Sequence, residues 1–159
     1  MKHFKSNMTY LYGTKGKDWV ADLPALTTQL ASKYQLTNLQ PVANMSFNYV
    51  ASGFQNEKPI ILKLGLNKKA IAKEVACLQA FAQHGAADIL ASEPGMILME
   101  RANPGTTLKA HFPDKDQQAV SVLCKSIQQL QTAEPPKQNH FYHLKELLST
   151  LDDKLIIPT

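Results

Sequence analysis

The run from residue 39 to residue 65 most limits what this chain can fold into, because it predicts three short strands in succession. We expect these strands over Leu39–Ala43, Tyr49–Phe54 and Ile60–Leu64. The small and polar sequence NMSFN joins the first two strands, and the polar sequence QNEKP supplies the turn before the third. This part of the chain is therefore predicted to form a sheet.

A helix is predicted before the strands, in DWVADLPALTTQLASKYQL. Pro24 fits the first turn of this helix, where a missing N–H costs nothing. Leu26, Leu30 and Tyr34 recur every four residues and give the helix an apolar stripe. Residues 1–17 are polar and punctuated by Gly and Lys, so we expect an extended N-terminal arm there.

A second helix is predicted directly after the strands, in NKKAIAKEVACLQAFAQHG. Asn67 is a candidate cap, and Gly85 is the signal that ends the helix. Ile71, Val75 and Leu78 have the spacing of a core-facing stripe. The strands are thus expected to have a helix packed against them.

Two more strands, DILAS and MILME, follow the second helix and are separated by the turn EPG. The Pro-Gly punctuated link RANPGTTL leads to a helix expected over residues 115–132. Its inward-facing residues are predicted to be Val120, Leu123, Ile127 and Leu130. The sequence EPPKQN breaks this helix, and FYHLKELLSTLDDKL predicts another short helix.

Composition indicates a folded protein of one domain or slightly more. The chain has 159 residues, of which 44% are hydrophobic, and its net charge is +4. The lysines are scattered, so a nucleic-acid-binding stripe is not indicated. No apolar run has the length of a membrane span or of a signal peptide, and a cytoplasmic location is expected. Cys77 and Cys124 lie at helix-like apolar positions and are predicted to be buried free thiols.

One lysine interrupts the apolar strand KPIILKL. In a strand, Ile60, Leu62 and Leu64 point to one face, and Ile61 and Lys63 point to the other. A lysine that is partly withdrawn from water needs an anion to offset the loss of hydration. Glu74 on the next helix is the candidate counter-ion, and a phosphate group is the candidate ligand. The alternative is an edge-strand lysine whose ammonium stays in solvent.

The sequence resembles the aminoglycoside and hydroxyurea phosphotransferases, the streptomycin-type small-molecule kinases. The resemblance rests on DWVADLPALTTQLASKYQL, NMSFNYV, PIILKLG, KEVACLQAF and MILMERANPGTTL, which occur in family order. It implies an α+β fold with a protein-kinase-like N-terminal lobe, which is a five-stranded antiparallel sheet with a helix. The implied divisions are the arm at 1–17, this lobe at 18–99, a hinge at 100–106 and the first helices of an incomplete C-terminal lobe at 107–159.

The same resemblance implies ATP with Mg²⁺ as cofactor and a small-molecule acceptor in the complete enzyme. Lys63 would contact the phosphates, and Glu74 would be its ion-pair partner. The loop from Asn44 to Asn48 would cover the phosphates, with Ser46 and Asn48 as donors because the loop has no glycine. The remaining roles fall to Ile61 as the roof over adenine, and to Met99, Glu100, Arg101 and Ala102 as the hinge beside it.

The chain departs from the family pattern in one respect that bears on catalysis. It contains no H-x-D-x-x-x-x-N segment, since none of its five histidines is followed two residues later by aspartate. The aspartate of that segment would orient the acceptor hydroxyl, and the asparagine would bind Mg²⁺. We therefore expect the N-terminal part of such an enzyme, with no catalytic residue and no metal ligand in this chain, and whether it catalyses a reaction stays open.

Other interpretations remain beside this one. The chain could be a non-catalytic module that binds nucleotide or a protein partner, and the apolar surface of an incomplete lobe would favour self-association. His140 and His143 are more typical of surface residues than of a zinc site, and Asp152 and Asp153 are more typical of a helix end than of Mg²⁺ ligands. Glu100 and Arg101 could form a surface ion pair of little energetic weight.

Overall fold

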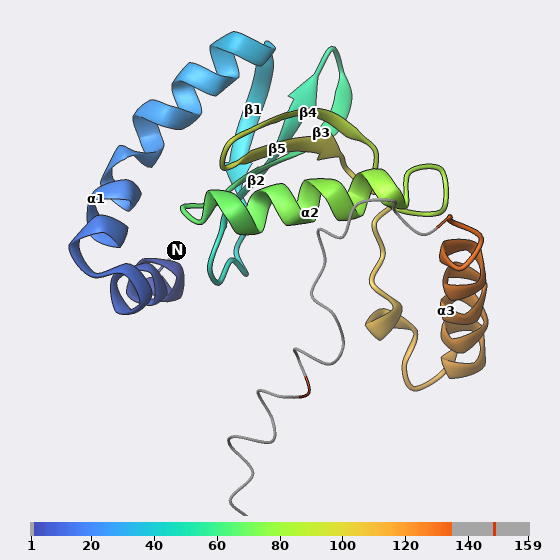
Figure 1. Cartoon of the computed structure of the whole chain (residues 1–159). Coiled ribbons are helices and arrows are strands. Elements are labelled where there is room, and N and C mark those ends of the chain that lie inside the picture. The colour runs from blue at the N-terminus through green and yellow to red at the C-terminus, as the bar shows by residue number, and fades with distance from the viewer. Residues whose placement is uncertain (1, 135–147, 149–159) are drawn as a thin grey trace, which may run out of the picture.

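The structure is a computed structural model that describes residues 2–134 and Leu148 (Figure 1). The short helix predicted near residue 145 lies outside the described residues, as do His140, His143, Asp152 and Asp153. The elements in chain order are α1 (Lys2–Tyr34), β1 (Leu36–Pro41), β2 (Tyr49–Gln55), β3 (Lys58–Leu64), α2 (Lys68–Ala80), β4 (Ile89–Glu93), β5 (Met96–Glu100), the 3₁₀ turn η1 (Leu108–His111) and α3 (Asp116–Leu130).

The five strands form one sheet in the order β1-β2-β3-β5-β4, and every neighbouring pair is antiparallel. The predicted α+β class and the five-stranded antiparallel sheet are therefore confirmed. β1 begins at Leu36, three residues earlier than expected, because Leu36 is a buried residue that pairs with Gln55. β3 lies in the middle of the sheet, so both of its edges are hydrogen-bonded to neighbours.

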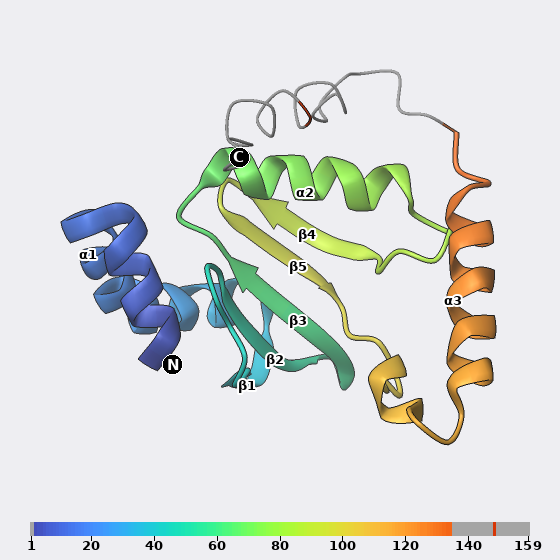
Figure 2. The same ribbon diagram turned by 90° about the horizontal axis from the view of Figure 1, so that it is seen from below.

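The two faces of β3 differ in burial. Ile60, Leu62 and Leu64 are at most 1% exposed and belong to the hydrophobic core that α1 covers. Ile61 and Lys63 point to the opposite face and are only half-buried. Figure 2 shows α1 beside the part of the sheet formed by β1, β2 and β3, and α2 beside β4 and β5. One face is thus closed by packing, and the other stays partly open.

The N-terminal residues are helical, so the prediction of an extended arm over residues 1–17 is wrong. α1 starts at Lys2 and is broken at Gly13, whose φ of 58° is open to glycine without strain. Phe4 and Met8, one turn apart, are fully buried in the core. The spacing of four residues between them is the sequence signal for a helix here. Their burial offsets the conformational entropy that the segment loses when it becomes ordered.

The two parts of α1 meet at Gly16. A Cβ atom on this residue would lie 2.2 Å from the carbonyl oxygen of Met8, which is backbone and has little freedom to move. The first part of α1 therefore folds back onto the second at a distance that only glycine permits. The second part continues through Pro24 to Tyr34, so the helix begins well before the expected first turn.

α2 begins as predicted. The side chain of Asn67 accepts a hydrogen bond of 3.1 Å from the backbone N–H of Ala70, which is the contact of an N-terminal cap. Of the predicted stripe, Ile71 is buried, whereas Val75 and Leu78 are half-buried. α2 contacts β4 and β5, and so it covers only part of the open face.

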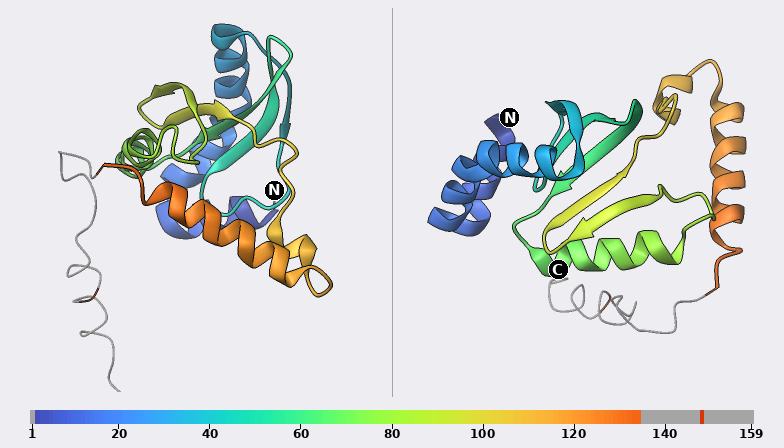
Figure 3. Two further views of the ribbon diagram at one scale, coloured as in Figure 1. Left: turned by 90° about the vertical axis from the view of Figure 1, so that its right-hand side faces the viewer. Right: turned by 90° about the horizontal axis from the view of Figure 1, so that it is seen from above.

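The predicted helix near residues 115–132 is present as α3, but its apolar stripe does not face inward. Val120, Leu123 and Ile127 are exposed, and the prediction for them is wrong. Figure 3 shows α3 at the end of the molecule opposite α1, and η1 is its main contact among the described elements. Cys124 is also exposed, contrary to the prediction of a buried thiol, and Cys77 is half-buried. No described helix has the length and apolarity to cross a membrane.

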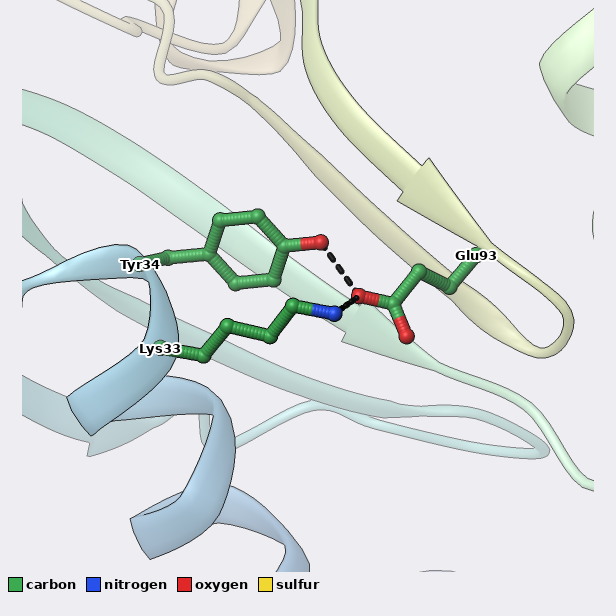
Figure 4. A network of polar contacts seen from close by, with 3 residues as sticks. All are labelled: Lys33, Tyr34 and Glu93. Carbon is green, nitrogen blue, oxygen red and sulfur yellow. Dashed lines mark hydrogen bonds and ion pairs between the residues drawn. The ribbon is translucent and has the colours of Figure 1, made fainter.

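A polar cluster fastens the end of α1 to the hairpin of β4 and β5 (Figure 4). Lys33 Nζ lies 2.6 Å from Glu93 Oε1, and the Tyr34 hydroxyl donates to the same oxygen. The hydrogen bonds from Lys33 and then from Tyr34 hold the pKa of Glu93 below its usual value. These groups are largely exposed, so the cluster fixes the position of α1 more than it adds stability.

Replacing Gly16 by alanine tests the fold-back of α1. We expect Gly16→Ala to lower the free energy of unfolding by about 1–3 kcal/mol, because the added methyl overlaps a backbone carbonyl. Urea unfolding measures this, with Lys15→Ala at an exposed neighbouring position as control. In an unconstrained helix the same change stabilises by about 0.5–1 kcal/mol. A more stable Gly16→Ala protein would therefore contradict the packing described.

Glu93→Gln tests the polar cluster through its pH dependence. Because the pKa of Glu93 is lowered on folding, its contribution is complete above the usual glutamate pKa of 4.5 and is lost as the pH falls through the folded value. We expect Glu93→Gln to lower the urea midpoint at pH 7 and to lower it by less at pH 3. A difference between the two proteins that is the same at both pH values would exclude the ionic contact.

Candidate functional site

The lysine that interrupts β3 makes an ion pair with the predicted partner. Lys63 Nζ lies 2.6 Å from Glu74 Oε1, and the contact joins the middle of the sheet to α2. Gly65 makes this approach possible, since a Cβ there would lie 2.7 Å from Cγ1 of Ile71. Ile71 is buried, and Glu74 follows it by three residues on the same side of the helix. The cap at Asn67 and the packing of Ile71 thus set the position of Glu74.

The pair keeps access to solvent. The side chain of Lys63 is 21% exposed and that of Glu74 is 34% exposed. The ammonium has three N–H donors, and within the described residues its hydrogen-bond partner is Glu74. Lys63 therefore has donors left for a further anion, while the contact with Glu74 holds its ammonium in place.

The strand register shows which residues share the open face with Lys63. Val50, Lys63 and Ile97 are aligned across β2, β3 and β5. The next row toward the beginning of β3 holds Ser52, Ile61 and Met99. Ile97 is buried, whereas the other five residues are half-buried. The floor beside the ion pair is thus mostly apolar and incompletely covered, which suits the flat face of a base or another planar group.

The loop predicted to cover phosphates lies at the same end of the sheet as Lys63. It runs from residue 42 to residue 48 and leads into Tyr49, which pairs with Leu64. The Oδ1 atom of Asn48 is close to Gly65, so the predicted donor Asn48 sits beside the connection between β3 and α2. Ser46 is exposed on the loop, and its carbonyl accepts a hydrogen bond of 3.0 Å from Nδ2 of Asn7.

The contact between Asn7 and Ser46 was not predicted from the sequence. The expected extended arm gave no reason to place Asn7 near the loop. The signal lies in Phe4, Asn7 and Met8, which share one face of a helix at i, i+3 and i+4. Met45 of the loop is buried in the same cluster as Phe4 and Met8, so the loop is anchored on the core side.

Two backbone N–H groups of the predicted hinge are already hydrogen-bonded within the protein. The N–H of Glu100 donates to the carbonyl of Asp88, and that of Arg101 donates to the carbonyl of Pro59. Within the described residues Ala102 is therefore the first residue of the link whose N–H is not taken by the sheet. A cavity of about 430 Å³ adjoins Glu100 and Arg101 at the turn between β2 and β3.

The structure does not bring the two halves of the predicted site into one cavity. Neither Lys63 nor Glu74 lines the cavity at Glu100 and Arg101. Glu100 pairs with Ile60, which is three residues before Lys63, or about 10 Å along the strand. An elongated ligand whose planar and anionic groups lie at opposite ends fits that separation. No three described His, Cys, Asp or Glu side chains are grouped so as to hold a metal ion.

Comparison with known proteins gives two matches. Residues 37–152 match the model of the family described as aminoglycoside/hydroxyurea antibiotic resistance kinase. The chain is also 26% identical over 129 residues to streptomycin 6-kinase of Streptomyces glaucescens, an alignment that covers 79% of this chain and 41% of that protein. The chain thus spans well under half the length of this relative. No solved structure gives a significant match.

The Lys63–Glu74 pair is expected to contribute little to stability. Both side chains are partly solvated, and exposed or half-exposed pairs are typically worth less than about 1 kcal/mol. We expect Lys63→Met to change the free energy of unfolding by less than this amount, because methionine retains the apolar stem. Urea unfolding of Lys63→Met and Glu74→Gln measures it. A loss of several kcal/mol would indicate that the lysine is held for structure and not for a ligand.

Proposed function

Because this chain belongs to the aminoglycoside/hydroxyurea antibiotic resistance kinase family, we propose that it forms the nucleotide-binding half of an ATP-dependent small-molecule phosphotransferase. The ion pair between Lys63 and Glu74 is the observation that carries this proposal. A half-buried ammonium with donors to spare and a fixed counter-ion is suited to bind a polyphosphate. A structural ion pair would need no open face beside it.

In this proposal the phosphates lie between Lys63 and the loop at residues 42–48. Lys63 would donate to the α- and β-phosphate oxygens, and Glu74 would keep the ammonium oriented when no ligand is bound. Ser46 and Asn48 would add hydrogen-bond donors from the loop. The net positive charge of the chain favours association with an anionic ligand.

The adenine would lie against the apolar rows of the open face, with Ile61 as its roof and Met99 beside Ile61 in the same row. Its edge would meet the link after β5. Because the N–H groups of Glu100 and Arg101 bond to the sheet, we assign the hydrogen bond to the adenine edge to the N–H of Ala102. Residues 18–99 would then be the N-terminal lobe, residues 100–106 the hinge and residues 107–159 part of the C-terminal lobe. Residues 2–17 belong with the first lobe, since they pack into its core.

Mg²⁺ accompanies ATP in kinases, but the described residues offer no acidic cluster that fits it. We propose that its ligands, and the aspartate that orients the acceptor hydroxyl, are not supplied by this chain, whose sequence lacks the H-x-D-x-x-x-x-N segment. The chain alone would then bind nucleotide without transferring phosphate. The family description and the relative suggest an aminoglycoside such as streptomycin, or hydroxyurea, as the acceptor of the complete enzyme.

A second candidate function is a protein contact through α3. Val120, Leu123 and Ile127 make an exposed apolar stripe on this helix, which is the kind of surface that binds another protein surface. Self-association of the chain is the simplest form of such contact. Light scattering of the wild type and of Ile127→Glu would test it, with a fall in apparent mass expected for the variant. Identical masses that correspond to one chain in both proteins would exclude self-association through this stripe.

Titration calorimetry with ATP tests the nucleotide site. We expect the wild type to bind ATP and Lys63→Met to bind it at least about tenfold more weakly, because the main phosphate contact is lost. Glu74→Gln should weaken binding less, since the lysine charge remains. Lys125→Met removes an exposed lysine from α3 and controls for the change in net charge.

Two outcomes would contradict the proposal. Equal ATP affinity of the wild type and Lys63→Met would remove Lys63 from the site. An absence of saturable ATP binding by the wild type would show that the chain does not form the half-site by itself.

A further inference from the structure

The loop at residues 42–48 has little support of its own. The N–H of Val42 donates to the carbonyl of Val50 across the base of the loop, and residues 43–44 form a turn, but from Ser46 to Asn48 the described residues show no backbone–backbone hydrogen bond. The loop also lacks glycine, so it cannot wrap a phosphate by the close backbone approach of a glycine-rich loop. The conformation of residues 46–48 therefore depends on contacts made by side chains.

Those side chains connect the loop to the first part of α1. The carbonyl of Ser46 accepts from Nδ2 of Asn7, across 39 positions of sequence. Met45 is 7% exposed and belongs to the core cluster that contains Phe4 and Met8. The ring of Phe4 also lies 6.4 Å from that of Tyr49, the residue that follows the loop.

The first part of α1 is itself held firmly. Phe4 and Met8 are fully buried, and the ring of Phe4 packs edge-on against Trp19 in the second part of the helix at 6.2 Å. Gly16 lets the two parts meet at backbone distance. The segment is thus packed against the second part of α1 and in contact with the loop, and Figure 1 shows it beside the turn between β1 and β2.

We infer that residues 2–12 brace the loop over the phosphates, and that Asn7 is a positioning residue of the nucleotide site. This inference rests on the proposed function. A loop already held in its binding conformation loses less entropy when the ligand binds, so the brace raises affinity without contacting the ligand. Asn7 acts through the carbonyl of Ser46, which sets the direction of the loop backbone. The neighbouring Asn48 is thereby kept beside Gly65, at the end of the strand that carries Lys63.

The test compares wild type with Asn7→Leu, which keeps the size of the side chain, adds no charge and removes the donor. ATP affinity is expected to fall about three- to tenfold, the range of one neutral hydrogen bond. The urea midpoint should stay close to that of the wild type, because Asn7 lies at the edge of the core. Lys5→Ala, at an exposed position of the same segment, is the matched control and should leave ATP affinity unchanged.

A measurement without nucleotide keeps this inference separate from the proposed function. Backbone NMR order parameters are near 0.85 for rigid segments and below about 0.6 for flexible ones. Asn7→Leu should lower the order parameters of residues 43–48 and leave those of β3 unchanged.

If the order parameters of the loop stay unchanged in Asn7→Leu, the inference that residues 2–12 brace the loop is wrong, whether or not ATP binds. If they fall while ATP affinity equals that of the wild type, Asn7 has only a structural role and the inference is overturned. If ATP binds to neither protein while the order parameters of the loop fall, the proposed function is wrong, but the claim that Asn7 holds the loop in place is supported.

Discussion

The rest of the structure depends on the position of β3 at the centre of the sheet. Paired on both edges, this strand has no freedom to rotate, so its alternation assigns each side chain to one face. Leucine and isoleucine on one face are buried by α1, and this burial fixes the register. Lys63 is consequently placed on the other face, because a slip by one residue would bring its ammonium into the core.

The two faces of the sheet differ, because one is fully covered and the other is only partly covered. α1 spans the core side and is fastened at its end by Lys33, Tyr34 and Glu93. α2 covers β4 and β5 and reaches β3 chiefly through the Lys63–Glu74 contact and the approach of Ile71 to Gly65. The ion pair and the packing of Ile71 lie next to each other. The packing fixes the helix, and the fixed helix places an acidic side chain beside the strand lysine.

Local signals in the sequence were sufficient for the sheet and for the ion pair. Short apolar runs bounded by turn residues located the five strands, and the Asn67 cap located the start of α2, because both signals depend on neighbours in sequence. The fold-back of residues 2–17 was missed, since the period-four spacing of Phe4 and Met8 spans a single turn and their partners are distant in sequence. The stripe on α3 was expected to face inward because period alone shows that a helix is amphipathic, not what lies against it. The N–H groups of Glu100 and Arg101 donate hydrogen bonds to Asp88 and Pro59. These bonds depend on the path of the link after β5, and no local sequence pattern predicts that path.

The contacts of the first helical segment also bear on how the chain acquires its structure during synthesis. Phe4, Asn7 and Met8 are made before their partners Met45, Ser46 and Tyr49, which follow about 40 residues later. Until the β1–β2 hairpin forms, this segment can pack only against the second part of α1, and a helix of its length is marginal in water. Its full docking therefore requires the hairpin, and the loop between β1 and β2 gains these contacts only when this earlier segment packs against it.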